Sequence, residues 1–210
     1  MSEIIFLSDV VLSFPHLIEP HASPMNPAAP KKYSADFIMP TTHPGVQQFM
    51  QNYAALAQEK WKENANTIMQ MIQSDRKLRC YGAGDEKVDK KTFKPYKGYA
   101  GNFSISANRA EAPQIIQPDG KPVDAGNTML YQALTRKMYG GCHVNAAIRP
   151  WLQDNQFGRG VRCDLVAVQF FKDGEAFGES EPDVSSMFGA VAAPAGGAMP
   201  AGMPAFLMPQ

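Results

Sequence analysis

The chain has 210 residues with 20 basic and 20 acidic side chains, so its formal net charge is zero. This length fits one domain with a tail, and a hydrophobic content of 44% is enough for one core. No run of about 18 apolar residues occurs, so no membrane-spanning helix is expected. The N-terminus lacks the positive start and small-residue cleavage site of a signal peptide, and we expect a strand there instead.

The charged residues are unevenly distributed. Residues 1–172 hold all 20 Lys and Arg and 15 of the acids, a net charge of +5, whereas residues 173–210 hold five acids and no base. Within the positive part, residues 76–97 alone carry eight basic and three acidic side chains. Opposite charges in separate parts of a chain predict a basic surface and an acidic interaction tail.

The first third of the chain predicts two strands and then a helix. Residues 4–14 and residues 33–39 have the β-branched, aromatic and alternating patterns of strands. The proline-rich residues 15–30 between them predict a long loop. From Pro44 to Trp61, apolar side chains recur every three or four residues, which predicts an amphipathic helix packed on the sheet or barrel.

The rest of the body predicts a shorter helix and three more strands. The helix is expected over residues 66–73, and the strands over residues 99–108, 141–151 and 161–172, with a hairpin loop at residues 154–160. Strands therefore dominate, with one helical region in the first half. This arrangement favours a mainly β fold, a closed or partly open barrel with inserted helices, over a parallel α/β sheet.

Residues 87–103, the basic-aromatic segment, combine two kinds of side chain that bind single-stranded nucleic acid. Asp89 is their only acid, and they interleave five lysines with four aromatic residues: Lys87, Lys90, Lys91, Lys94, Lys97, Phe93, Tyr96, Tyr99 and Phe103. Lysines pair with phosphates, and aromatic rings stack on unpaired bases with little regard to sequence. The alternative is a lysine-rich edge strand whose rings pack inward and whose charges remain solvated.

The C-terminal residues predict a flexible tail. From Pro182 onward, Gly, Ala, Pro and Met dominate without helical or strand periodicity, so we expect disorder. The last apolar residues, 206–208, are too few to form a core. They are either a docking peptide or without a role.

Neither a metal centre nor an enzyme active site is indicated. Cys80, Cys142 and Cys163 are odd in number and form no CxxC pair, as expected of buried or incidental thiols in a reducing cytoplasm. The four histidines are scattered, and no two have ligand spacing, so we expect no metal or other cofactor. Serine-hydrolase, zinc-protease and ATPase motifs are absent from the sequence. The acids of residues 85–89 are better explained as a solvated turn than as metal ligands.

Residues 139–178, YGGCHVNAAIRPWLQDNQFGRGVRCDLVAVQFFKDGEAFG, resemble a family of phage single-stranded-DNA-binding proteins with an OB-fold. Within this family, the residues resemble a branch formerly described as a domain of unknown function. The resemblance rests on a strand, a Pro-Trp pair, a turn and a second strand, and at the start on residues 13–17. The matching positions are Gly141-Cys142-His143-Val144-Asn145, Pro150-Trp151, Asp154-Asn155, Gly158 to Val161 and Val168-Gln169-Phe170.

The resemblance implies an OB-fold-like, partly open five-stranded barrel over residues 1–178 and a flexible tail over residues 179–210. It also implies sequence-tolerant binding of single-stranded DNA in phage replication, recombination or repair, in the host-cell cytoplasm. A negative tail would contact phage or host replication proteins or shield the basic groove. The chain departs from the family at His143, which replaces an aromatic residue, and in its tail, where 27 uncharged residues follow the acids.

Together, the segment and the resemblance predict a nucleic-acid site of basic and aromatic side chains. Its members are Arg76, Lys77, Arg79, Lys87, Lys90, Lys91, Phe93, Lys94, Tyr96, Lys97, Tyr99, Arg149 and Trp151. For Trp151, packing in the core or against a loop is the alternative. Two other functions stay open at this point: a phage structural or assembly protein with a β-rich body, and an enzyme that cleaves DNA with a metal.

Overall fold

One sheet of seven strands organises the computed structural model, which describes residues 2–22, 27–124 and 126–178. The strand order is β3-β4-β2-β1-β6-β7-β5, and every pairing is antiparallel except that of β5 with β7. The strands are β1 (Ile5–His21), β2 (Lys32–Pro40), β3 (Tyr81–Ala83), β4 (Asn102–Arg109), β5 (Gln114–Ile116), β6 (His143–Asn155) and β7 (Gly158–Lys172).

The prediction of a mainly β fold with inserted helices is confirmed. The five long strands β1, β2, β4, β6 and β7 are the five that the sequence predicts, and β3 and β5 add two short edge strands. Strands β4 and β7 lie side by side without forming a hydrogen-bonded pair, so the sheet curls but does not close. The OB-fold assignment remains a prediction, and the predicted tail, residues 179–210, lies outside the described residues.

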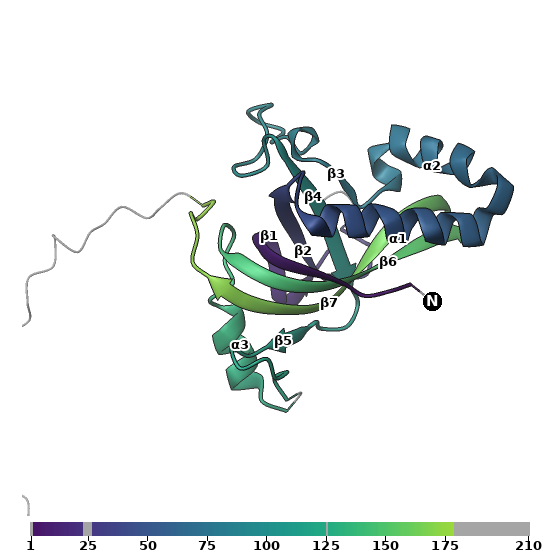
Figure 1. Ribbon diagram of the computed structural model, residues 1–210. Coiled ribbons are helices and arrows are strands. Elements are labelled where there is room, and N and C mark those ends of the chain that lie inside the picture. Colours follow the sequence, from purple (N-terminus) through teal and green to yellow (C-terminus); the bar gives the residue numbers. More distant parts are fainter. Residues whose placement is uncertain (1, 23–26, 125, 179–210) are drawn as a thin grey trace, which may run out of the picture. The chain divides into compact units, whose positions relative to one another are not determined.

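The helices cover two separate parts of the sheet. Figure 1 shows α1 (Pro44–Trp61) and α2 (Ala65–Ser74) together on one side and α3 (Thr128–Thr135) beside β5 on the other. Short 3-10 helices follow α1 and α2 and precede the basic-aromatic segment: η1 (Lys62–Asn64), η2 (Arg76–Leu78) and η3 (Gly84–Glu86). In the described part of the chain, no helix is both long enough and apolar enough to span a membrane.

Helix α1 has the predicted bounds because its sequence specifies both its start and its buried face. The Nδ1 atom of His43 accepts a hydrogen bond from the Gly45 N–H and caps the helix, and Pro44 follows in the first turn. Phe49, Tyr53 and Ala57 recur every four residues and are buried in the core. The helix therefore packs its apolar stripe on the strands, as predicted.

Two predictions about local structure are wrong. Strand β1 does not end at residue 14: it bends at Phe14, where φ is 45°, and continues to His21, which pairs with Lys32. Continued pairing with β2 satisfies the backbone of this proline-containing stretch, so the predicted loop is shorter. Helix α3, which contradicts the expectation of a single helical region, is short and is capped by the Asn127 side chain.

Candidate nucleic-acid interface

The basic-aromatic segment is anchored on the sheet by a buried carboxylate. Asp36 lies on β2 between Ser13 of β1 and Ser106 of β4, and it is 8% exposed. The Tyr99 hydroxyl donates to Asp36 over 2.7 Å, and the Lys87 ammonium pairs with the same carboxylate and with Ser106. The buried charge is thus paired and hydrogen-bonded, as burial requires.

Tyr99 therefore has a structural role, and its burial contradicts its prediction as a stacking residue. Lys87 takes part in the same anchor, and its prediction as a phosphate contact stays a prediction. Tyr99 is fully buried, and burial, with the neighbouring Asp36 charge, raises the pKa of its phenol well above its usual value. A buried ring has no free face for a base. The Lys87 ammonium lies 5.6 Å from the Tyr99 ring centre and is engaged with Asp36, so phosphates would have to compete with an ion pair.

Beyond this anchor, residues 88–96 form an ordered loop, here called the tip loop. The Asp89 N–H donates to the Lys94 carbonyl over 2.9 Å, and the Phe93 N–H donates to the Asp89 carbonyl over 2.8 Å. The Asp89 carboxylate accepts the Lys91 N–H, also at 2.8 Å. Asp89, the only acid of the segment, is thus used to shape the loop. Figure 1 shows this connection between β3 and β4 beyond the point where β2 ends and β4 begins.

The tip loop exposes the side chains that a single strand of DNA would contact. Lys90, Lys91 and Lys94 are exposed and form no salt bridge with any described residue. Phe93 is 81% exposed and has a φ of 55°, which phenylalanine rarely adopts. Holding a large ring in water at an unfavourable backbone angle lowers the stability of the folded protein, and such strained residues cluster at functional sites.

Tyr96 closes the tip loop and adds an aromatic contact that the sequence did not reveal. Tyr96 is 37% exposed, and its ring meets the Phe14 ring edge to face with ring centres 5.1 Å apart. Phe14 is half-exposed and projects from the bend in β1, with a positive φ of 45°. Nothing in the residue pattern of β1 predicts that bend, so Phe14 was not a candidate.

The chain after β7 packs against the basic-aromatic segment just after the tip loop. Lys97 pairs with Glu175 at 2.8 Å and donates to the Ala176 carbonyl at 3.0 Å. The Phe177 N–H donates to the Gly140 carbonyl at 2.9 Å. Lys97, a predicted phosphate contact, is therefore paired with an acid from the start of the negatively charged region, and Phe177 is a second candidate that the sequence analysis missed.

Helix η2 places the predicted arginines and lysine of residues 76–79 in different environments. Arg76 and Lys77 are exposed, and the Arg76 guanidinium donates to the Glu86 carbonyl beside the segment. The Arg79 side chain is only 6% exposed, pairs with Glu86 at 2.9 Å and donates to the Tyr81 carbonyl at 2.8 Å. Arg79 is thus buried in the fold, and its prediction as a phosphate contact is corrected for this reason.

Arg149 and Trp151 lie at the other end of β1 from the tip loop. Ile5 of β1 pairs with Ile148, just before Arg149, whereas Phe14 contacts Tyr96 nine residues further along β1. Trp151 is 39% exposed, so it is a surface residue and not a core residue. Arg149 pairs with Asp164 at 3.6 Å. The structure therefore does not bring these two residues together with the tip loop.

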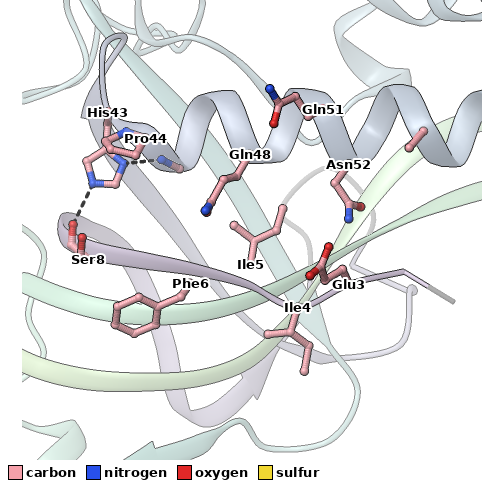
Figure 2. Close-up of a pocket in the computed structure, with 12 residues that line it drawn as sticks. Glu3, Ile4, Ile5, Phe6, Ser8, His43, Pro44, Gln48, Gln51 and Asn52 are labelled. Carbon is pink, nitrogen blue, oxygen red and sulfur yellow. Dashed lines mark hydrogen bonds between the residues drawn. The ribbon is translucent and has the colours of Figure 1, made fainter.

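A larger hollow lies where the start of β1 meets α1, but its chemistry does not fit phosphates. Its volume is about 620 Å³. Figure 2 shows Glu3 and the amide groups of Gln48, Gln51 and Asn52 around it, with His43 bonded to the Ser8 carbonyl at 2.8 Å. It is lined by no Lys or Arg and by one carboxylate. The hollow therefore offers no Lys or Arg to neutralise phosphates, and its carboxylate would repel them.

Comparison with known proteins identifies the family. The family described as "Enterobacter phage Enc34, ssDNA-binding protein" matches residues 3–196. The chain belongs to this family. Protein p50 of Acyrthosiphon pisum secondary endosymbiont phage 1 is 31% identical over 173 residues, which cover 81% of this chain and 84% of that protein.

Solved structures agree with this assignment. The single-stranded DNA-binding protein from bacteriophage Enc34 is 25% identical, with a TM-score of 0.60 and coverage of 88% of this chain and 89% of that chain. The same phage protein in complex with single-stranded DNA gives a TM-score of 0.63 at 24% identity, over 83% of this chain and 89% of the other. The fold is therefore that of a phage single-stranded-DNA-binding protein, as the resemblance predicted.

Proposed function

We propose that this protein binds single-stranded DNA with little sequence preference, without catalysis, during phage DNA replication, recombination or repair in the host cytoplasm. The proposal is carried by the tip loop, where the exposed Phe93 is within three residues of three exposed lysines that form no salt bridge with any described residue. The lysines would neutralise phosphates, and the ring would stack on a base. Family membership supports this function over that of a virion structural protein.

The proposed path of the DNA runs from the tip loop across η2. Arg76 contacts Glu86 next to the segment, and the Lys77 carbonyl accepts from the Arg162 guanidinium of β7 at 3.1 Å. In the pairing of β6 with β7, Arg162 lies directly opposite Trp151. Positive charges would thus continue from the tip loop toward Arg149 and Trp151, and these two residues would contact a longer single-stranded DNA.

A titration over a salt series tests the proposed function. Fluorescence anisotropy of labelled oligothymidylate should show binding whose log–log slope against salt is about −0.7 per phosphate neutralised. A mixed-sequence oligonucleotide of equal length should bind with similar affinity, since stacking is sequence-tolerant. Absence of binding at low salt, or binding that salt does not weaken, would contradict the proposal.

A further inference from the structure

A small cavity opens beside the tip loop, between three aromatic rings. It has a volume of about 330 Å³ and is lined by Phe14 and Pro15 of β1, Tyr96 and Lys97 of the basic-aromatic segment, and Gly140 and Phe177. This volume is near the lower end of ligand-binding pockets, roughly 300–1,000 Å³. The lining therefore comes from four distant parts of the chain and leaves room for one small, flat group.

We propose that this cavity is a slot for one unstacked base of single-stranded DNA. The proposal rests on the proposed function and deepens it, because it assigns a binding role to Phe14 and Phe177. Aromatic walls favour a flat π-system, and no carboxylate is among the lining residues. Lys94 is exposed on the adjoining tip loop and is suited to the phosphate that joins such a base to the next.

The Phe177 ring, one of the three aromatic walls of the cavity, is held in place by contacts of the neighbouring chain. The Phe177 ring covers Gly98, where an added Cβ would lie 2.5 Å from the ring, and Gly98 has a φ of 82°. Both features require glycine at this position. The Phe177 N–H bond to Gly140 and the Lys97–Glu175 pair hold residues 175–177 beside the segment. Pre-formed walls reduce the ordering entropy that binding would otherwise cost.

The other two aromatic walls, Phe14 and Tyr96, are also positioned before DNA binds. Phe14 and Tyr96 meet edge to face at an interplanar angle of 82°, and Phe14 lies 6.3 Å from the buried Tyr99 ring. Tyr99, which is hydrogen-bonded to Asp36, therefore supports the Phe14 wall of the slot. A base entering the slot would displace water from half-exposed rings, which adds apolar burial to the phosphate contacts.

Two substitutions of Phe177 in the full chain test the slot. Phe177→Ala should weaken oligothymidylate binding by about 5- to 150-fold, the equivalent of one lost stacking contact. Phe177→Leu keeps an apolar side chain over Gly98 but lacks the flat ring, and it should also bind more weakly. Phe157→Ala is the matched control, because Phe157 is 80% exposed on the turn between β6 and β7 and should not change affinity.

Photocrosslinking identifies the contact without any substitution. Oligothymidylate carrying 5-iodouracil should crosslink to peptides that contain Phe14, Tyr96 or Phe177, as mapped by mass spectrometry. If the wild type binds DNA and both Phe177 variants bind with the same affinity, the slot is overturned and the proposed function stands. The same holds if the wild type binds DNA and crosslinks only at Trp151. Absence of wild-type binding at low salt would overturn both.

Discussion

Two parts of the basic-aromatic segment contain the same kinds of side chain, lysine and aromatic, in opposite roles: the anchor, formed by Lys87 and Tyr99 on Asp36, and the tip loop. Lys87 and Tyr99 contact the buried Asp36, whereas Lys90, Lys91 and Phe93 project into water. Lys87 and Tyr99, which flank the tip loop in the sequence, stabilise the fold, whereas the lysines and the ring between them are free to bind. Burial next to a partner decides which role each residue has.

This comparison suggests why a loop can serve as a binding surface here. In the anchor, the Lys87 ion pair and the Tyr99 hydrogen bond to Asp36 hold both ends of the tip loop on the sheet. The tip loop itself is shaped by backbone hydrogen bonds, by the Asp89 and Thr92 side chains, and by the contact of Tyr96 with Phe14. Ligand-binding residues can therefore remain exposed without losing their position.

The largest effect is expected at the anchor. Tyr99→Ala removes a fully buried ring and leaves a cavity under the segment, so it should lower the free energy of unfolding by about 3–5 kcal/mol in urea denaturation. Tyr99→Phe is the matched variant: it keeps the ring and removes only the hydroxyl bond to Asp36, with a loss of about 1–2 kcal/mol. Full stability of Tyr99→Ala together with weaker DNA binding would reverse the assignment.

The sequence predicted the fold better than it predicted the site. Helix α1 and the five long strands follow from local periodicity, which is a property of neighbouring residues. The split of the segment depends on Asp36, which lies 51 residues before Lys87 in the chain and reaches it only through the sheet. Alternating lysines and rings carry no information about that partner.

The same reasoning explains the residues that were missed. Phe14 becomes accessible because β1 bends at a positive φ, and Phe177 reaches Gly98 because the chain turns back after β7. Both are long-range outcomes. A signal for Phe177 did exist: this residue lies within residues 139–178, which carry the family resemblance, although it is next to the boundary of the predicted tail.

The second-largest effect is expected for the charges of the tip loop. Combined Lys90→Gln, Lys91→Gln and Lys94→Gln should reduce the log–log salt slope of binding by about 2, since each phosphate contributes about 0.7. This corresponds to roughly a hundredfold change in relative affinity for each tenfold change in salt. Lys121→Gln is the control, because Lys121 is exposed near β5, away from the tip loop, and should leave the slope unchanged. An unchanged slope in the triple variant would place the phosphates elsewhere.

A smaller effect is expected for the exposed ring. Phe93→Ala should weaken binding by about 1–3 kcal/mol without loss of stability, because the side chain packs on little else. Phe93→Gly should bind as weakly but unfold at the same or a higher urea concentration, since glycine accepts a φ of 55°. If both variants bind normally and unfold more readily, Phe93 belongs with the anchor and the comparison fails.

The smallest effect tests a charge that is remote from the tip. Asp9 sits at a bulge in β1 with a φ of 52° and contacts Lys172 at 2.7 Å and His143 at 2.5 Å. The Lys172 hydrogen bond, followed by the His143 bond, lowers the pKa of Asp9 below its usual 3.8, although partial desolvation opposes the shift. The carboxylate therefore stabilises the folded state above pH 3.8, and this contribution is lost as pH falls through the lower folded-state pKa.

Asp9→Asn should cost at most about 1 kcal/mol at neutral pH, because the pair is partly solvated, and asparagine tolerates the positive φ. In urea unfolding followed from neutral to acidic pH, the stability gap between wild type and variant should shrink as Asp9 becomes protonated. DNA affinity measured at neutral pH should be the same in both proteins, since Asp9 contacts no residue of the tip loop. A gap that persists in acid would mean that packing, not charge, accounts for the loss. A change in affinity would extend the binding surface along β1 toward the bulge, so that the anchor and the tip would no longer be the two regions that matter.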